Sequence, residues 1–278
     1  MIARCRDAFP VVLMCRCLKV SPSGFYDWAR REPGPREREN RRLLKKIERI
    51  HTESDGVYGS PRVYDELRYN GETCSLNRVA RLMKTAGIQG IPQRKRWSKK
   101  TSEARPDGVV NHLSRNFTAA EPDTKWVTDI TYIRTGEGWL YLAVVLDLHT
   151  RQVIGWSMSH VMDKHLVIQS VLMALWQRKD KQAVVLHSDR GSQYTSHEYQ
   201  QFLRAHNVVS SMSAVGSCYD NAAAESFFGL LKRERVNRRR YVTRAEARSD
   251  VFDYIERFYN RRKQSEMEGA RLQLTTLN

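Results

Sequence analysis

The hydrophobic positions of this chain follow two different periods, and the change between them divides the chain into two regions. From Arg38 to about His51, leucine and isoleucine recur every three or four residues with arginine and lysine between them. This spacing predicts an amphipathic helix. From Lys125 onward the pattern changes to alternating positions and short apolar runs, which indicate strands. We therefore expect a helical region followed by a sheet-containing region.

The helical region contains two more predicted helices. We expect Ser60 to cap the first of them and Pro61 to occupy its first helical position, with Asn70-Gly71 at its end. The second runs from about Leu76 to Ala86 and stops at Gly87. Its polar face carries three basic residues, Arg78, Arg81 and Lys84. Three helices with a basic last member fit a helix-turn-helix-like DNA-binding unit, and a structural bundle with a solvated basic face is the alternative.

A basic segment follows these helices. It includes Arg94, Lys95 and Arg96, with Trp97 directly after them. Lysine and arginine beside an aromatic residue suit contacts with phosphates and stacking on bases, so we include these residues among the DNA-binding candidates. Such a run is also typical of a flexible linker.

The second region predicts an α/β fold, a mixed sheet with helices on both faces. A turn at Gly136-Glu137-Gly138 joins the first two strands, and Asp220 can cap the last helix. The predicted strands are Lys125–Ile133, Trp139–Leu146, Val153–Ser159, Ala183–His187 and Val208–Ser211, and the predicted helices are Leu166–Trp176, Ser196–Ala205 and Asn221–Glu234. We expect five parts in all: a lead-in segment 1–36, a helix-turn-helix-like domain 37–100, a linker 101–120, a core 121–235, and a basic C-terminal helix with its tail 236–278.

The net charge of +16 is unevenly distributed along the chain. Residues 1–115 hold 25 Lys/Arg against 13 Asp/Glu, residues 116–225 hold 9 against 11, and residues 226–278 hold 13 against 7. A near-neutral middle between two basic flanks indicates a core served by segments that bind a polyanion. A cationic protein whose charge only aids solubility is the alternative.

The five cysteines match neither a disulfide framework nor a zinc site. They are odd in number and irregularly spaced, and Cys15-x-Cys17 has no downstream Cys or His pair at metal spacing. The apolar runs are too short for a membrane span or for a signal sequence. We expect a soluble protein of a reducing, intracellular compartment.

Three acidic residues can converge in this topology. Asp129 lies in the first predicted strand and Glu225 lies on the last helix. Asp189 follows the fourth strand, at the carboxyl end where the active sites of open α/β sheets collect. Cleaving and joining phosphodiesters requires an activated attacking oxygen and a stabilised leaving oxygen, and two Mg²⁺ ions about 3.5–4 Å apart provide both. Carboxylates are the hard oxygen ligands that such ions take.

We expect Asp129 to bridge both ions, and Asp189 and Glu225 each to complete the shell of one ion. Lys232 follows Glu225 by seven residues, close to two helical turns, so the two share a face. On that face Lys232 is placed to hold a phosphate beside the metal ions.

Each of these residues also has a structural interpretation. An aspartate often belongs to a turn or a cap, and a glutamate on a helix is usually a solvated charge. Asp147 competes for the metal role, although we expect it to end the second strand before a turn. His187 competes as a proton shuttle, although a histidine inside a strand more often packs. The sequence contains no Gly-rich phosphate loop and no nucleophile elbow that would favour another chemistry.

Motifs around the three carboxylates resemble those of a known family. The motifs are Trp126-x-x-Asp129-x-Thr131-Tyr132, His187-Ser188-Asp189-x-Gly191-x-Gln193-Tyr194 and Asp220-Asn221-Ala222-x-x-Glu225-Ser226-Phe227-Phe228-x-x-Leu231-Lys232. They closely resemble the retroviral-integrase-like transposases of bacterial insertion sequences, the kind whose second reading frame encodes the catalytic part. The segment from Tyr58 to Met83 is similar to the helix-turn-helix segment of that family.

The resemblance implies a ribonuclease-H-like integrase core with Asp129, Asp189 and Glu225 as its acidic triad. It implies Mg²⁺ or Mn²⁺, two ions per active site, and cleavage and strand transfer at insertion-sequence ends by water or a DNA 3′-hydroxyl, with no covalent enzyme intermediate. The implied partners are the DNA of the terminal repeats and of the target, further copies of the chain in a homo-oligomer, and the first-frame DNA-binding protein. The implied location is the bacterial cytoplasm, at the nucleoid, without a membrane.

Two departures from the family pattern motivate an alternative function. After Arg262 the family continues with a His-Ser-x-Leu-Gly-like segment, whereas this chain reads Lys263-Gln264-Ser265-Glu266, which we interpret as a truncated or frame-shifted tail. We also expect the usual first-frame DNA-binding region to come from a partner to which this chain is fused or paired. The alternative is a catalytically inactive or decayed transposase that acts as a DNA-binding regulator. A ribonuclease H acting on RNA–DNA hybrids also fits the core, but it leaves the basic helical region unexplained.

Overall fold

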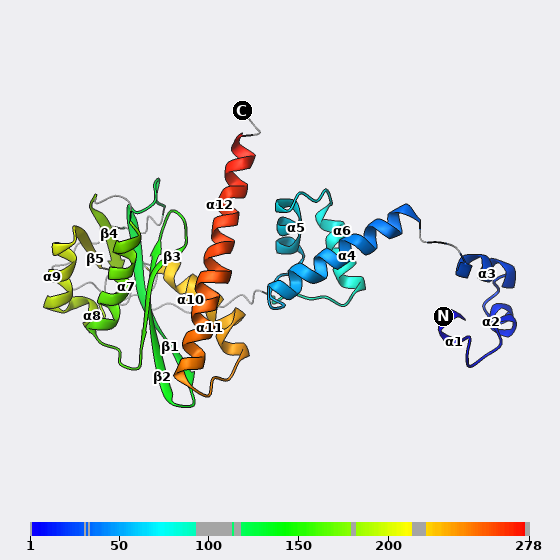
Figure 1. The fold of residues 1–278 in the computed structure, drawn as a ribbon, viewed down its shortest axis with the longest axis horizontal. Helices are drawn as coiled ribbons and strands as arrows, with labels where there is room; N and C mark the ends of the chain where they lie inside the picture. The colour runs from blue at the N-terminus through cyan, green and yellow to red at the C-terminus, as the bar shows by residue number, and fades with distance from the viewer. Residues whose placement is uncertain are drawn as a thin grey trace, which may run out of the picture. The chain divides into compact units, whose positions relative to one another are not determined.

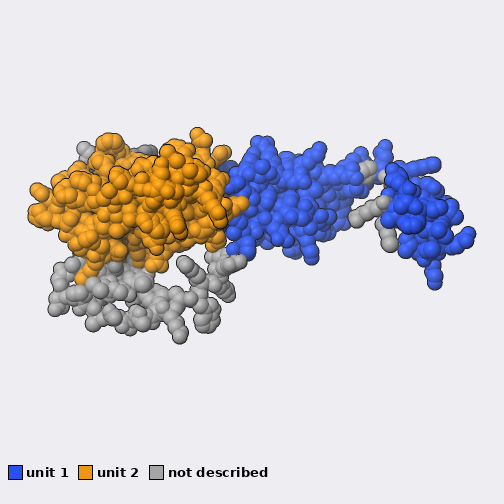
Figure 2. All heavy atoms as spheres, turned by 90° about the horizontal axis from the view of Figure 1, so that it is seen from below, with its two compact units in different colours: residues 1–92 blue, residues 93–278 orange. Residues whose placement is uncertain are grey.

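The computed structural model of the chain describes residues 2–30, 32, 34–92, 113, 118–178, 182–212 and 221–275. The chain divides into two compact units, residues 1–92 and residues 93–278, which Figure 2 colours separately. The basic segment around Arg94, Lys95 and Arg96, most of the expected linker, and Asp220 lie outside the described residues.

The described part of the first unit is helical, as the hydrophobic period predicts. Its helices are α1 (Ile2–Cys5), α2 (Val11–Cys17), α3 (Pro22–Arg30), α4 (Pro35–Glu53), α5 (Ser60–Tyr69) and α6 (Leu76–Thr85) (Figure 1). The three predicted helices correspond to α4, α5 and α6. The segment 1–36, for which we predicted no separate elements, contains α1 to α3.

Helices α4 to α6 pack through the apolar faces that their periodicity predicts. Each contributes two buried side chains, namely Leu43 and Ile47, Val63 and Leu67, and Val79 and Met83. The expected cap at Ser60 is wrong by one position, because Gly59 is the N-cap of α5 and Ser60 begins the helix. Gly87 ends the last helix with a φ of +71°, a left-handed conformation that glycine adopts without strain.

An ionic cluster links α4 to the connection between α5 and α6. The carboxylate of Glu72 accepts hydrogen bonds from Arg42 at 2.6 and 3.0 Å and is also paired with Lys46. The bonds from Arg42 have the largest effect and those from Lys46 the next, and they lower the pKa of Glu72 from its usual value to about 2. A depressed pKa means that the paired, charged form stabilises the fold.

The second unit contains a five-stranded sheet in the order β3-β2-β1-β4-β5. The strands are β1 (Lys125–Thr135), β2 (Gly138–Asp147), β3 (Val153–Ser159), β4 (Val184–Ser188) and β5 (Val208–Met212). The pairs β1–β2 and β2–β3 are antiparallel, and β1–β4 and β4–β5 are parallel. This is the mixed sheet that the sequence predicts, and every predicted strand is confirmed to within two residues at each end.

Helices cover both faces of the sheet (Figure 1). They are α7 (Lys164–Gln177), α8 (Ser192–Thr195), α9 (His197–Ala205), α10 (Ala222–Glu234), η1 (Val236–Arg238), α11 (Arg244–Asp253), the π-helical segment η2 (Tyr254–Tyr259) and α12 (Asn260–Thr275). Alternate residues of β2 serve the two faces. Leu142 and Val144 pack with residues of α10, α11 and η2, whereas Ala143 and Val145 pack with residues of α7 and α9.

Two details of this unit differ from expectation. The residue at the N-cap position of α10 is Asn221, not Asp220. Where one C-terminal helix was expected, α11 begins separately after Thr243, whose hydroxyl accepts a hydrogen bond from the Glu246 amide, and η2 then joins α11 to α12. This cap ends the preceding turn and lets the chain change direction before α11.

The backbone of α7 lies very close to the backbone of β3. A Cβ atom built on Gly155 of β3 would lie 2.1 Å from the carbonyl oxygen of Ser170 and 2.8 Å from the amide of Ala174. Such contacts are far inside van der Waals distance, so only glycine permits this helix–strand spacing.

We predict that Glu72→Gln weakens the first unit at pH 7 and has less effect at pH 3. The pKa of the Glu72 carboxyl is about 2 in the folded chain, compared with 4.5 for a glutamate without partners. The ion pairs therefore stabilise the unit above pH 4.5 and are progressively lost as the pH falls toward 2. Hydrogen exchange of the α4 and α6 amides in the full chain measures this. Glu53→Gln, which removes an exposed pair with Arg49 within α4, is the control. Equal protection of wild type and Glu72→Gln at pH 7 would contradict the prediction.

Candidate active site

Asp129 lies in the central strand β1, where the sheet changes from antiparallel to parallel pairing. Val127 and Ile133 belong to the hydrophobic cluster on the α10 side of the sheet. Because side chains alternate along a strand, Asp129 leaves β1 on the same side as these two residues. Its side chain is half-buried.

Asp189 follows the last residue of β4 and lies beside the continuation of β1. The parallel pairing of the two strands ends with Val127 opposite His187. Asp129 follows Val127 by two residues, and Asp189 follows His187 by two residues. The carboxylate of Asp189 accepts a hydrogen bond of 3.0 Å from the amide of Gly191. A Cβ atom on Gly191 would lie 3.2 Å from the same oxygen, so this turn suits glycine.

Glu225 lies in the first turn of α10, on its exposed side. Three residues of the opposite side, Ala224, Phe227 and Leu231, are buried against the sheet. The start of the helix is attached to β1, because the side-chain amide of Asn221 donates a hydrogen bond of 3.2 Å to the carbonyl of Thr128. This bond places the first turn of α10 next to the residue that precedes Asp129.

The charges of the predicted site residues act on one another. The pKa of Asp129 is raised to about 7, first by burial and then by the negative charges of Asp189 and Glu225. The hydrogen bond from the Ile130 amide, 2.8 Å long, and the positive charge of Lys232 act in the opposite direction. The three carboxylates and the lysine therefore face one region at the point where β1 and β4 part.

The donor set of this region suits a hard divalent cation. All three side chains offer carboxylate oxygens, the ligands that Mg²⁺ prefers. Burial and then repulsion raise the pKa of Asp129, and a cation would offset the repulsion. Within the described ranges, no three His, Cys, Asp or Glu side chains lie close enough together to form a ready-made metal site. The carboxylates thus fit the cation in chemistry, without forming a ready-made site among the described residues.

The two competing residues have structural roles. Asp147, the last residue of β2, accepts hydrogen bonds from the amides of Asp123 at 3.1 Å and Thr150 at 2.7 Å, so it ends the strand in a turn as predicted. His187 is buried inside β4, and its Nδ1 lies 2.9 Å from the hydroxyl of Ser211. The interpretation of His187 as a packed residue is therefore favoured.

Two residues that support the site had no role assigned from sequence. Besides Asn221, the buried Tyr194 places its hydroxyl 3.4 Å from the hydroxyl of Thr128, directly beneath the start of the Asp129 segment. Burial raises the pKa of Tyr194 well above its ordinary value, so it is a neutral phenol. Both residues lie inside the motifs that resemble the family, so the sequence contained a signal for their importance. Their partners lie far away in the sequence, so the sequence did not show which residues they contact.

The predicted DNA-contact residues of the first unit differ in exposure. Arg81 and Lys84 of α6 are exposed. Arg78 is half-buried, and its Nε donates a hydrogen bond of 2.9 Å to the side chain of Asn40 in α4. Arg78 therefore helps to join α6 to α4, and Arg81 and Lys84 are more accessible to a ligand.

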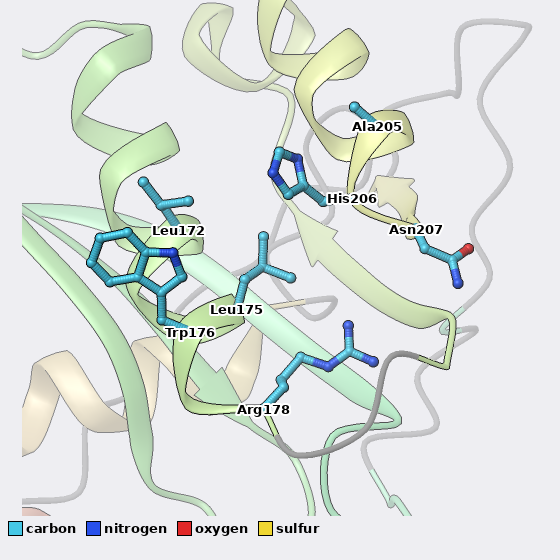
Figure 3. Close-up of a pocket in the computed structure, with 7 residues that line it drawn as sticks. All are labelled: Leu172, Leu175, Trp176, Arg178, Ala205, His206 and Asn207. Atoms are coloured by element: carbon cyan, nitrogen blue, oxygen red, sulfur yellow. The ribbon is translucent and has the colours of Figure 1, made fainter.

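A pocket of about 420 Å³ lies elsewhere in the second unit, between the ends of α7 and α9 (Figure 3). It is lined by Leu172, Leu175, Trp176, Arg178, Ala205, His206 and Asn207. None of these residues is an acidic candidate, so the pocket has no part in the chemistry described above. No helix in the described part of the chain is long and apolar enough to cross a membrane.

Three family models match the chain. Residues 37–96 match an HTH-like domain, residues 119–218 match an integrase core domain, and residues 225–275 match a second integrase core domain model. The last match extends through the segment in which the sequence departs from the expected motif.

The chain is also similar to several known proteins and solved structures. It is 43% identical to transposase InsF for insertion sequence IS3A of Escherichia coli K12, over 91% of this chain and 88% of the relative. It is 37% identical to a 31 kDa protein of insertion element IS600 of Shigella sonnei, over 92% and 94%. The catalytic domain of the Mos1 mariner transposase aligns with a TM-score of 0.41 and 12% identity, over 51% of this chain and 75% of that one. The magnesium complex of the HTLV-2 integrase catalytic core aligns with a TM-score of 0.34 and 20% identity, over 41% and 70%.

The identity to InsF extends through both the helical unit and the sheet-containing unit. The family expected from the three motifs is confirmed, as is the fold class. The chain belongs to the IS3-family insertion-sequence transposases, with an HTH-like domain followed by an integrase core.

Proposed function

We propose that this transposase cleaves and joins DNA with Asp129, Asp189 and Glu225 as the ligands of two divalent metal ions, Mg²⁺ or Mn²⁺. The observation that supports the proposal most directly is the raised pKa of Asp129, which reflects its burial and the two carboxylates that face it. A buried carboxylate that two other carboxylates repel is more typical of an active site than of a structural core.

The chain's own residues have distinct roles in this proposal. When bound, the metal ions activate the attacking oxygen, from water or a DNA 3′-hydroxyl, and stabilise the leaving oxygen. The charges of both Asp189 and Glu225 act on Asp129, which is the candidate for the shared ligand. The amide of Gly191 orients Asp189, and the bond from Asn221 to β1 orients the helix that carries Glu225.

Lys232 is a candidate for holding the phosphate. It lies two helical turns after Glu225, and its charge acts on Asp129. A lysine ammonium at this place offers hydrogen bonds to a non-bridging phosphate oxygen and partly neutralises the charge that develops there.

We infer further that the helical unit binds the insertion-sequence ends. The exposed Arg81 and Lys84 on α6 are available to contact phosphates, and Arg94, Lys95 and Arg96 extend the same basic character along the sequence. The proposal also includes a homo-oligomer that holds two element ends, and pairing with the first-frame protein. In this proposal the chain acts on DNA in the bacterial cytoplasm.

We predict that Glu225→Gln abolishes cleavage and strand transfer while DNA binding persists. The substitution removes an ionisable metal ligand and leaves the basic surface intact, and the loss of activity should be at least about a hundredfold. Labelled element-end DNA with Mg²⁺ or Mn²⁺ provides the assay. Glu198→Gln, which changes an exposed glutamate of α9 paired with Lys164, is the matched control. Wild-type cleavage by Glu225→Gln would refute the assignment.

We predict that Asp129→Asn raises the melting temperature in metal-free buffer and abolishes the effect of Mg²⁺ on it. An amide removes the repulsion from Asp189 and Glu225, and each kcal/mol gained shifts the melting temperature by about 2–4 °C in a unit of this size. In wild type, Mg²⁺ at a hundred times its dissociation constant should add about 2.7 kcal/mol. Scanning calorimetry with and without Mg²⁺ measures both effects. A variant that Mg²⁺ stabilises as much as wild type would exclude Asp129 as a ligand.

We predict that Arg81→Ala and Lys84→Ala weaken binding to all duplex sequences alike. Each removes one phosphate contact, so the slope of log affinity against log salt should fall by about 0.9 per residue. Fluorescence anisotropy over a salt series measures the slope. Arg49→Ala, which removes an exposed arginine of α4 paired with Glu53, is the control. Unchanged slopes for both α6 variants would indicate that α6 faces solvent in the complex.

A further inference from the structure

Two large aromatic side chains lie exposed on the first two strands of the integrase core. Tyr132 of β1 is 57% exposed and Trp139 of β2 is 46% exposed. Their ring centres are 5.1 Å apart and their planes are inclined by 80°, an edge-to-face contact. Because the planes are inclined by 80°, a flat ligand can stack on the face of one ring while the other ring packs against the edge of the ligand.

The strands that carry this aromatic pair are held in place by residues far away in the sequence. Arg244, at the start of α11, donates hydrogen bonds to the carbonyl of Trp139 at 3.1 Å and to the carbonyl of Glu137 at 2.6 Å. The amide of Gly136 donates a hydrogen bond of 2.9 Å to the carbonyl of Tyr241. The hairpin is therefore braced against the C-terminal helices, so a ligand meets a preorganised surface.

A positive charge at one end of the aromatic pair connects it with the acidic site. The Nζ atom of Lys232 lies 4.9 Å from the centre of the Tyr132 ring, and the same lysine acts on the carboxylate of Asp129. Arg134 is exposed and pairs in register with Trp139. One lysine thus lies next to both the aromatic pair and the carboxylates, and the whole surface attracts an anion.

We propose that Tyr132 and Trp139 form a stacking surface for an unpaired DNA base next to the phosphate held at the acidic site. The inference rests on the proposed function. Bases inside a duplex are covered by their neighbours, so an exposed ring pair can stack on a base only at a frayed end or in a single strand. The flanking lysine and arginine match the backbone phosphates on either side of such a base, which a purely apolar protein partner would not need.

The surface has a clear functional consequence. Stacking on a base beside the cleavage point would hold the strand end open and fix the position of its terminal phosphate relative to the three carboxylates. Tyr132 and Trp139 would then be positioning residues that act on the DNA strand and not on the reacting atoms.

The test compares blunt element-end DNA with the same DNA carrying a short unpaired end, using the full chain in EDTA so that no cleavage occurs. Fluorescence anisotropy measures affinity, and 2-aminopurine at the unpaired position reports stacking by the quenching of its fluorescence. Wild type should bind the unpaired end more tightly and quench the probe. The double substitution Tyr132→Leu with Trp139→Leu should reduce this preference by about tenfold and restore the fluorescence, with blunt-end affinity unchanged.

Matched variants separate stacking from other effects. Tyr132→Phe with Trp139→Phe keeps the rings and should behave as wild type. Trp176→Leu removes an indole of α7 that is 81% exposed and outside the aromatic pair, and it should change nothing. Melting temperatures of all variants check that each is folded.

Several outcomes would overturn the inference. These are an unchanged preference in the leucine double variant, an equal loss of blunt-end and unpaired-end binding, or the same loss in Trp176→Leu. A change of oligomeric state in the leucine variant with its preference intact would assign the surface to contacts between copies of the chain. Because the assay contains no metal and needs no cleavage, its result is independent of the outcome for Glu225→Gln.

Discussion

The burial of one carboxylate close to two others is the constraint around which the integrase core of this transposase is arranged. Asp129 is half-buried and faces Asp189 and Glu225, so ionising it is unfavourable, as its raised pKa shows. A chain does not keep such a group in place unless the surrounding structure is stable enough to hold it. Here the group sits on the central strand of five, with a hydrophobic cluster packed on each face of the sheet.

The helix that carries Glu225 is fixed at both ends. At its start, the side chain of Asn221 is bonded to β1. At its end, Glu234 is 1% exposed and accepts hydrogen bonds from Tyr254 at 2.8 Å and from Arg262 at 3.3 Å. A buried carboxylate with its partners in place stabilises one particular packing, because removing any partner leaves an unpaired charge inside the protein. The C-terminal helices thus hold in place the helix that carries Glu225.

The distribution of positive charge along the chain matches separate roles for its segments. The helical unit and the C-terminal segment carry most of the positive surplus, while the segment that contains the carboxylates is near neutral. A polyanion is attracted mainly by the flanking segments, and the acidic residues need little excess positive charge around them beyond Lys232. The same lysine also lies over Tyr132, which connects the acidic site to the exposed aromatic pair.

The sequence by itself predicted α4 to α6, the five strands, α7, α9 and α10, and it singled out the three acidic residues. Local periodicity sets which side of an element is apolar, and the motifs around Asp129, Asp189 and Glu225 are short. Only the tertiary structure decided which polar side chains have partners. It paired Arg78 with Asn40, joined Asn221 to Thr128, and brought Tyr132 against Trp139 and Lys232. Most of these contacts join residues far apart in the chain, and they depend on how whole elements pack, which no local pattern of residues encodes.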